Sequence, residues 1–248
     1  MKYYVNSNFD KVTLDLSQEI FTLSNHYIKA TGSCIIALSG GSTPIKLYQQ
    51  LAEQFLHLED IHRKKIIFIQ VDERWVPSDH ERSNQNMISN IFTPNHYNFV
   101  PFPHVGINSK VSHSTTEYNN HITEIIKNTG KNAIDIIILG MGDDGHTASL
   151  FPLNPDYIKL LGNNTETISF STFVNEQNEL RLSLSPNFII NATNRFLLIS
   201  GANKGKVLNN VFKINDNKKY PIQIAFDNKT SVYLDQICYQ QLELNNNS

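Results

Sequence analysis

The sequence has few of the residues that build metal or redox sites. Only two cysteines occur in 248 residues, Cys34 and Cys238, and neither stands in a Cys-x-x-Cys pair or in a Cys/His spacing typical of zinc. An HExxH segment is also missing. The sequence therefore predicts no metal site and no redox motif, and we expect both cysteines to be buried thiols in a reducing compartment.

The sequence also lacks an excess of charge of one sign and any long apolar run. Its 21 basic and 23 acidic residues give a formal charge of -2 and are spread along the chain, so no polyanion-binding face is predicted. No segment approaches the roughly 18 apolar residues that a membrane span requires, and the polar start MKYYVNSNFDKV has no apolar stretch of signal-peptide length. We expect no nucleic-acid partner, no membrane partner and a cytoplasmic protein. Its oligomeric state is open between a monomer and a small homo-oligomer.

Short apolar runs alternate with helical patterns over most of the chain. CIIALS (34–39), IIFIQV (66–71) and DIIILG (135–140) are rich in β-branched residues and apolar on both faces, as in central strands of a covered parallel sheet. Further strands are predicted at 168–174, 179–185 and 195–200; the alternation in RLSLS favours an antiparallel or edge strand. We predict one α/β domain over residues 1–248, Rossmann-like, with a mostly parallel sheet, helices on both faces and a few added antiparallel strands.

Helices are predicted from their apolar spacing and from residues that start or stop them. The first covers residues 9 to 30 and ends near Gly32. A second begins at Ser42-Thr43-Pro44, with proline at the first helical position. A third runs from Ser83 toward Phe92. Another ends at Gly130, and a last one follows Asn203 as N-cap. Residues 93–113 are the longest irregular stretch and are predicted to form a loop over the site.

Each of the three clearest strands ends in a polar or glycine-rich segment, and in an open parallel sheet ligands bind at the carboxyl ends of the strands. After 34–39 comes GGSTP, in which Gly40 and Gly41 allow close backbone approach while Ser42 and Thr43 stand at a helix N-terminus. This segment resembles a phosphate cradle but is not a P-loop, because the lysine and second glycine of GxxxxGK[ST] are missing. A plain strand-to-helix turn explains the pattern equally well.

After 66–71 comes DERWVP, with two carboxylates and a guanidinium in three consecutive positions. Asp72 and Arg74 share one side of an extended segment, and an arginine can bind a phosphate or carboxylate through two hydrogen bonds, so we assign both a function. For Glu73 we expect a surface salt bridge instead.

The most informative segment is GMGDDGHTASLFP (140–152). Its glycines permit a tight turn that presents Asp144 and His146 at the end of a buried strand, just before an expected short helix. A histidine in this place fits a general base. Whether Asp72 or Asp144 orients its imidazole stays open at this point.

Two further cations are candidate phosphate ligands. Lys204 falls in the first turn of the helix after Asn203, where a positive charge opposes the helix dipole unless an anion is bound. A solvated surface lysine is an equally good explanation. Arg181, in RLSLS, either serves the same anion or lines a strand face.

These motifs together resemble the 6-phosphogluconolactonases. SGGSTP, VDERWVP, SNQNM and GMGDDGHTASLFP carry the likeness, and RLSLSP and SGANKGKVL continue it in the same order, from about Ser39 to Leu208. The resemblance implies a fold shared with glucosamine-6-phosphate deaminases and isomerases, no cofactor, and hydrolysis of 6-phosphogluconolactone to 6-phosphogluconate in the oxidative pentose phosphate pathway.

Carried onto this chain, the resemblance implies that His146 is the catalytic histidine, with Asp72 and Arg74 beside it. Gly41, Ser42 and Thr43 match its phosphate-binding positions, joined by Arg181 and Lys204. Two alternatives remain. Deaminase or isomerase chemistry uses a glutamate just before the proline of the histidine motif, where this chain has Phe151. A non-catalytic sugar-phosphate sensor needs an output module, for which the residues before the first strand leave no room.

Overall fold

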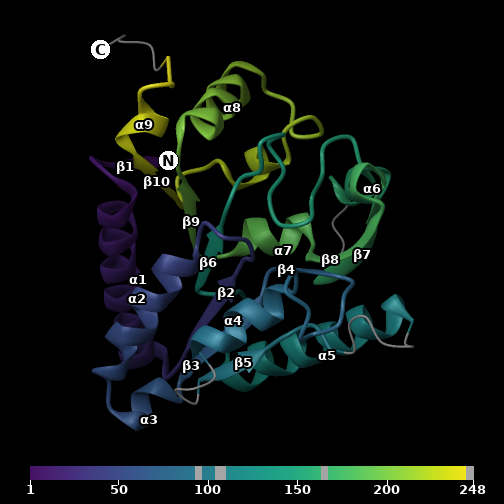
Figure 1. Ribbon diagram of the computed structural model, residues 1–248. Helices are drawn as coiled ribbons and strands as arrows, with labels where there is room; N and C mark the ends of the chain where they lie inside the picture. The colour runs from purple at the N-terminus through teal and green to yellow at the C-terminus, as the bar shows by residue number, and fades with distance from the viewer. Residues whose placement is uncertain (93–96, 104–109, 163–166, 244–248) are drawn as a thin grey trace.

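The structure is a computed structural model that describes residues 1–92, 97–103, 110–162 and 167–243. Its centre is a seven-stranded parallel sheet (Figure 1). In spatial order the strands are β1 (Lys2–Asn6), β10 (Thr230–Asp235), β9 (Asn194–Ile199), β6 (Ile136–Leu139), β2 (Cys34–Leu38), β3 (Ile66–Gln70) and β5 (Asn98–Val100).

Helices cover both faces of this sheet, as the sequence predicted. Figure 1 shows α1 and α2 on the left of the sheet and α5 and α7 to its right. The helices are α1 (Phe9–Thr31), α2 (Ile45–Leu56), α3 (Asp60–Arg63), α4 (Asn84–Phe92), α5 (Val111–Thr129), α6 (Pro155–Leu160), α7 (Pro186–Asn191), α8 (Ala202–Lys213) and α9 (Gln236–Tyr239). Two 3₁₀ turns, η2 (Asn175–Gln177) and η3 (Pro221–Ala225), complete the described elements.

Alternate side chains of the central strands enter two different cores. In β2, Cys34, Ile36 and Leu38 pack with buried residues of α1, α2 and α4. Ile35 and Ala37 of the same strand pack on the opposite face with residues of α5, α7 and α8. Because successive side chains of a strand point to opposite faces, a strand covered on both sides must be apolar throughout. This is the physical reason for the uninterrupted apolar runs.

A second, antiparallel sheet of three strands packs against one face of the large sheet. It consists of β4 (Asp72–Arg74), β8 (Glu179–Leu184) and β7 (Ser169–Val174), with β8 in the middle. Leu182 and Leu184 of β8 are buried in the core shared with α5 and α7. The predicted mostly parallel fold with added antiparallel strands is confirmed.

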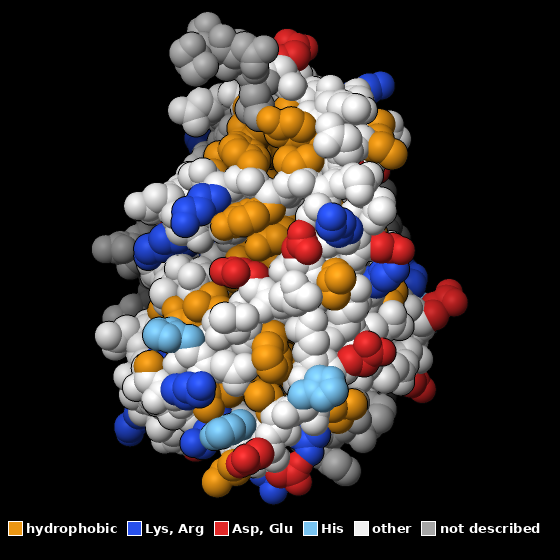
Figure 2. All heavy atoms as spheres, turned by 90° about the vertical axis from the view of Figure 1, so that its left-hand side faces the viewer, with side chains coloured by type: hydrophobic (Ala, Val, Ile, Leu, Met, Phe, Trp, Pro, Cys, Tyr) orange, Lys and Arg blue, Asp and Glu red, His pale blue; other side chains and the backbone are white. Residues whose placement is uncertain are grey.

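The outer face of the helical layer shows acidic and basic side chains close together, with separate apolar patches between them (Figure 2). This distribution matches the even spread of charge along the sequence. No helix among the described residues is long and apolar enough to cross a membrane.

Several local predictions are wrong. Gly201, not Asn203, is the N-cap of α8, and Pro44 is the N-cap of α2 and not its first helical residue. No helix follows His146 directly; Thr147 and Leu150 close a tight turn, and α6 begins only at Pro155. Of the predicted loop 93–113, residues 98–100 form β5 and α5 begins at Val111, while 93–96 and 104–109 lie outside the described residues.

Candidate active site

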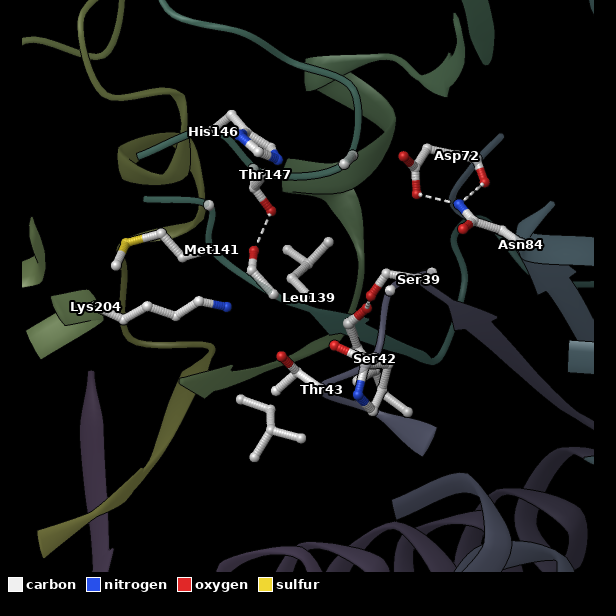
Figure 3. Close-up of a pocket in the computed structure, with 18 of the residues that line it drawn as sticks. Ser39, Ser42, Thr43, Asp72, Asn84, Leu139, Met141, His146, Thr147 and Lys204 are labelled. Atoms are coloured by element: carbon white, nitrogen blue, oxygen red, sulfur yellow. Dashed lines mark hydrogen bonds between the residues drawn. The ribbon is translucent and has the colours of Figure 1, made fainter. Parts of the chain in front are cut away.

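The carboxyl ends of β2 and β6 lie side by side at the point where the chain reverses its direction across the sheet. From β2 the chain proceeds to β3 and β5 on one side, whereas β6 and the later strands lie on the other. Ligands of open α/β sheets bind at such a switch point. A pocket of about 320 Å³ opens here, within the range of small-molecule sites. Figure 3 shows side chains from several separate segments converging on it.

The segment after β2 forms one wall of the pocket and contains Gly40, Gly41, Ser42 and Thr43. Gly41 has φ +89°, which a residue with a side chain rarely adopts. Gly40 is packed so tightly against Asn84 that a Cβ would lie 1.8 Å from its Oδ1. The two glycines therefore have separate tasks: Gly41 makes the turn, and Gly40 allows α4 to approach.

His146 stands on a tight loop after β6 and lines the pocket. Gly145 before it has φ +83°, and the Gly142 amide donates to the His146 carbonyl over 2.9 Å. Gly142 also lies against the imidazole, since a Cβ there would be 2.1 Å from Cε1 and Nδ1. The glycines predicted to shape this loop are thus required both by its backbone and by the space that the imidazole occupies.

Asp144 is the carboxylate that contacts His146. Its Oδ1 lies 2.6 Å from Nδ1 of the imidazole and accepts the His146 amide over 3.0 Å. Burial raises the pKa of Asp144, but the hydrogen bonds and charge of His146 outweigh this and hold the pKa below its ordinary value. The carboxylate is therefore ionised at neutral pH. With Nδ1 facing Asp144, Nε2 is the ring nitrogen left for chemistry, and it has no hydrogen-bond partner among the described residues.

Asp72 also lines the pocket but makes different contacts. Its Oδ2 accepts the Ser149 hydroxyl over 2.9 Å, and the Asn84 amide donates to its backbone carbonyl over 2.9 Å and to Oδ1 over 3.3 Å (Figure 3). Asp72 is 5% exposed and ties α4 to the loop that follows His146. Of the two aspartates that the sequence left open, the structure brings Asp144, not Asp72, to the imidazole.

Arg74 and Arg181 lie directly opposite each other in the register of β4 and β8, and both line the pocket. Like charges placed in this way repel unless a counter-charge is present. Glu179 supplies one, because its Oε2 lies 2.6 Å from Arg181 Nε. Burial lowers the pKa of Arg181, while Asp72 and Glu179 act in the opposite direction. An anion in the pocket would complete the neutralisation.

Lys204 enters the pocket from α8, on the opposite side from Asp72 (Figure 3). Within the part of the chain that the structure describes, it has no hydrogen bond or ion pair. The helix begins at Gly201, whose amide donates to Asp235 at the end of β10. Lys204 is therefore a free cation on a fixed helix, facing the glycine-rich wall.

The structure thus brings all the predicted site residues to one pocket, except that Asp144 stands behind His146 and lines a neighbouring hollow. Asn84 and Thr147 also line the pocket but were not predicted as site residues. For Asn84 the signal was present in the SNQNM motif. The prediction of a surface salt bridge at Glu73 is wrong: its carboxylate is 1% exposed and accepts hydrogen bonds from Gln70, Ser83 and the backbone amides of 74, 84 and 85.

Glu73 thereby fixes the start of α4, which carries Asn84. Burial raises the pKa of Glu73, and the hydrogen bonds from the amides of Gln85 and Asn84 counteract part of this rise. Among the described residues, no cluster of three or more histidine, cysteine or acidic side chains is able to hold a metal ion.

Comparison with known proteins places similar chains in one family. A family model described as glucosamine-6-phosphate isomerases/6-phosphogluconolactonase matches residues 7–234. A 6-phosphogluconolactonase of Nostoc sp. is 34% identical over 221 residues, which are 84% of this chain and 83% of that protein.

Solved structures give the same result for the fold. The 6-phosphogluconolactonase of Trypanosoma cruzi superposes with a TM-score of 0.82 and 27% identity, covering 98% of this chain and 97% of the other. A monomeric glucosamine-6-phosphate deaminase superposes with a TM-score of 0.76 and 18% identity, covering 97% of this chain and 100% of the other. The fold is therefore common to proteins named for two different reactions.

Proposed function

The chain belongs to the glucosamine-6-phosphate isomerase/6-phosphogluconolactonase family, and from this premise we propose that it hydrolyses 6-phospho-D-glucono-1,5-lactone to 6-phospho-D-gluconate in the oxidative pentose phosphate pathway. The observation that carries the proposal is the pocket itself. His146, paired with the ionised carboxylate of Asp144, shares the pocket with the amides and hydroxyls of residues 40–43. The cations Arg74, Arg181 and Lys204 line the same pocket. These groups match what hydrolysis of a phosphorylated lactone requires, which is an anion site, a base for water and a cation at the carbonyl.

The phosphate group is assigned to the glycine-rich wall and Lys204. Ser42 and Thr43 present hydroxyls before the N-terminus of α2, and backbone amides in such a place attract anions. Lys204 is unpaired and enters from the facing helix. We assign Arg181 to the same anion in a supporting role, since Glu179 already neutralises part of its charge.

In the proposed reaction His146 acts as general base. Its Nε2 takes a proton from a water molecule as the water oxygen attacks the C1 carbonyl of the lactone. Arg74 stabilises the negative charge that develops on the carbonyl oxygen. The C1–O5 bond then breaks, and the imidazolium returns its proton to the ring oxygen. The new carboxylic acid loses its remaining proton to the solvent, so the product leaves as a carboxylate. Asp144 holds the Nδ1 proton and stabilises the imidazolium that forms after proton transfer.

Asp72 has a different proposed task. Its carboxylate is held by Ser149 and Asn84, so it keeps β4, α4 and the His146 loop in register at the pocket wall. It also adds negative charge near Arg181. Asp72 therefore positions the substrate-binding wall, and proton transfer is assigned to His146 with Asp144.

Ring-opening deamination is the competing reaction within this family. The glutamate that it uses before the proline of the histidine motif is replaced here by Phe151, which is 5% exposed and packed against His146. Asp72 and Asp143 also line the pocket, but among the described residues only Asp144 bonds to the imidazole, and it already holds Nδ1. We therefore propose hydrolysis and use the deaminase substrate as a control.

The test is a direct assay of lactone disappearance, corrected for spontaneous hydrolysis. Glucosamine-6-phosphate and fructose-6-phosphate are assayed in parallel. We expect turnover of 6-phosphogluconolactone and no reaction with the other two. The variant His146→Ala should fold normally and lose about 10²-fold to 10⁴-fold in kcat, the usual contribution of a general base. Turnover of glucosamine-6-phosphate at a rate comparable with that of the lactone would refute the proposed function.

A further inference from the structure

Two side chains hold the imidazole of His146 in place. Asp144 binds its Nδ1 edge, and the ring of Phe151 lies flat against its face, with 4.5 Å between the ring centroids and 28° between the planes. One hydrogen bond fixes the position of a ring edge, but coupled changes in the two side-chain torsions can still tilt the plane of the ring. The stacked phenyl ring removes this freedom, because the imidazole cannot turn without losing the contact or colliding with it.

Phe151 also contacts a second group of the proposed machinery. The guanidinium carbon of Arg181 lies 5.7 Å from the centroid of the phenyl ring, within the range of cation–π contacts. Arg181 is held from its other sides by Gln177 and Glu179. A single buried ring therefore contacts both the proposed base and a cation that lines the same pocket.

The position of Phe151 between two hollows adds a third observation. His146 and Arg181 line the pocket described above, whereas Phe151 lines a neighbouring hollow of about 400 Å³ together with Asp144 and residues 152–155 and 174–177. The phenyl ring thus stands behind the imidazole. A smaller side chain at this position would give the imidazole room to move back into the second hollow.

We propose that Phe151 is a positioning residue that fixes the plane of the His146 imidazole and so sets the direction of Nε2 toward the reacting water. This inference rests on the proposed hydrolysis. Proton transfer is efficient only when base and proton are held within hydrogen-bond reach and in line, so rotation of the ring lowers kcat without removing the base. Substrate binding depends mainly on the glycine-rich wall and Lys204. Of the proposed phosphate ligands Phe151 contacts only Arg181, which has a supporting role, so KM changes less than kcat.

The test compares Phe151→Leu and Phe151→Met, which remove the ring, with Phe151→Tyr, which keeps it. Stacked aromatic pairs contribute about 0.5–1.5 kcal/mol, which corresponds to about twofold to tenfold in kcat. We expect the Leu and Met variants to lose this factor with KM nearly unchanged, and Phe151→Tyr to retain most of the wild-type kcat.

The matched control is Phe21→Leu. Phe21 makes one aromatic contact, with Phe55 at 5.8 Å, in the core on the opposite face of the sheet. It should lower the melting temperature and leave kcat unchanged. If Phe151→Leu and Phe21→Leu affect kcat equally, or if Phe151→Tyr loses as much as Phe151→Leu, the ring has only a structural role and the inference is wrong.

A second readout is independent of activity and separates this inference from the proposed function. The Hε1 proton of His146, assigned as the NMR signal that is missing in His146→Ala, should be shifted upfield in the wild type by the ring current of Phe151. It should move downfield in Phe151→Leu. An inactive wild type with this shift would overturn the hydrolytic function and leave the stacking intact. A wild-type signal without the upfield shift would overturn the positioning role, whatever the activity.

Discussion

The contact between Asp144 and His146 leads to a prediction that separates charge from orientation. One oxygen, Oδ1 of Asp144, receives both the His146 amide and Nδ1 of the imidazole. In Asp144→Asn the amide oxygen can occupy this place and accept the same two hydrogen bonds, so the ring orientation is kept and only the negative charge is lost. In Asp144→Ala both the charge and the hydrogen bonds are lost.

The size of the charge effect follows from the exposure of the pair. Two unit charges ~4 Å apart attract by about 1 kcal/mol in water and about 4 kcal/mol near a protein surface with an effective dielectric constant of ~20. The Asp144 side chain is 49% exposed, so solvent screening places the value in the lower part of that range, about 1–2 kcal/mol. Loss of this stabilisation of the imidazolium lowers kcat by about fivefold to thirtyfold in Asp144→Asn. Asp144→Ala should reach about 10²-fold or more, as expected for a mispositioned base.

The assay is steady-state lactone hydrolysis, with kcat and KM determined for both Asp144 variants and for Asp72→Asn as the comparison. Asp72 does not contact the imidazole, and its substitution disturbs the buried contacts to Ser149 and Asn84. We expect Asp72→Asn to raise KM and lower the melting temperature more than Asp144→Asn does. In the background of His146→Ala, Asp144→Asn should have almost no further effect on kcat, because residues that act as a unit are not additive.

Asp144 does not serve the base if Asp144→Asn and Asp144→Ala both keep wild-type kcat while Asp72→Asn loses more than about 10²-fold in kcat. Asp72 would then be the carboxylate that serves the base in solution. Full additivity of Asp144→Asn and His146→Ala in kcat would also show that the observed contact has no part in the reaction.

Four further outcomes are expected. Lys204→Ala should lower kcat/KM for the phosphorylated lactone by about 10-fold to 100-fold, the value of a hydrogen bond to a charged group, and leave gluconolactone unaffected; equal losses would remove Lys204 from the phosphate site. Gly142→Ala places a methyl 2.1 Å from the His146 ring and should cost about 10-fold to 100-fold in kcat, whereas Gly140→Ala, with no atom within 4 Å of its new methyl, should cost far less. Burial raises the pKa of both cysteine thiols to about 12, so a thiol reagent should react at pH 8 only as the protein unfolds; rapid labelling of the native protein would show that the thiols are accessible. Activity should survive prolonged chelation, and a complete loss that zinc restores would contradict the metal-free mechanism.

The raised pKa values of the two thiols also determine the direction in which the stability of the fold changes with pH. Their pKa values are higher in the folded protein than in the unfolded chain, so between about pH 9 and 12 the native state binds more protons than the unfolded state. Stability falls as the pH rises through this window. The contribution of Asp144 has the opposite sign: because its pKa is lowered, it is present above the ordinary value of 3.8 and is lost as the pH falls below it.

Helices and strands with a strong apolar period were predictable because their burial is recorded in the residues themselves. The runs at β2, β3 and β6 are apolar on both faces, and the structure covers both faces. The first helix was placed to within one residue, since an amphipathic pattern ends at Gly32, whose φ of +83° terminates the helix. The edge strand β1 was missed because KYYVN is partly exposed and carries no clean alternation. Its neighbour β10 was missed although it is mostly buried, because its apolar run, 232–234, is only three residues long.

The motifs by themselves determined which residues meet at the site. Glycine-rich and charged segments follow buried strands, and the carboxyl ends of neighbouring parallel strands share one edge of the sheet, so the meeting of GGSTP, DER and the His146 loop follows from local sequence and strand direction.

Only the tertiary structure decided how those residues pair. The roles of Asp72 and Asp144 depend on the exact path of two loops, and the stacking of Phe151 depends on packing between a loop and a second sheet. The prediction for Glu73 was wrong for the same reason. A carboxylate next to an arginine in the sequence suggests an exposed ion pair, but α4 covers Glu73, and the backbone amides of 84 and 85 donate hydrogen bonds to its carboxylate. Most of these contacts join residues that are far apart in the sequence. Their energies depend on distance and burial in the folded protein, and a linear pattern of residues encodes neither quantity.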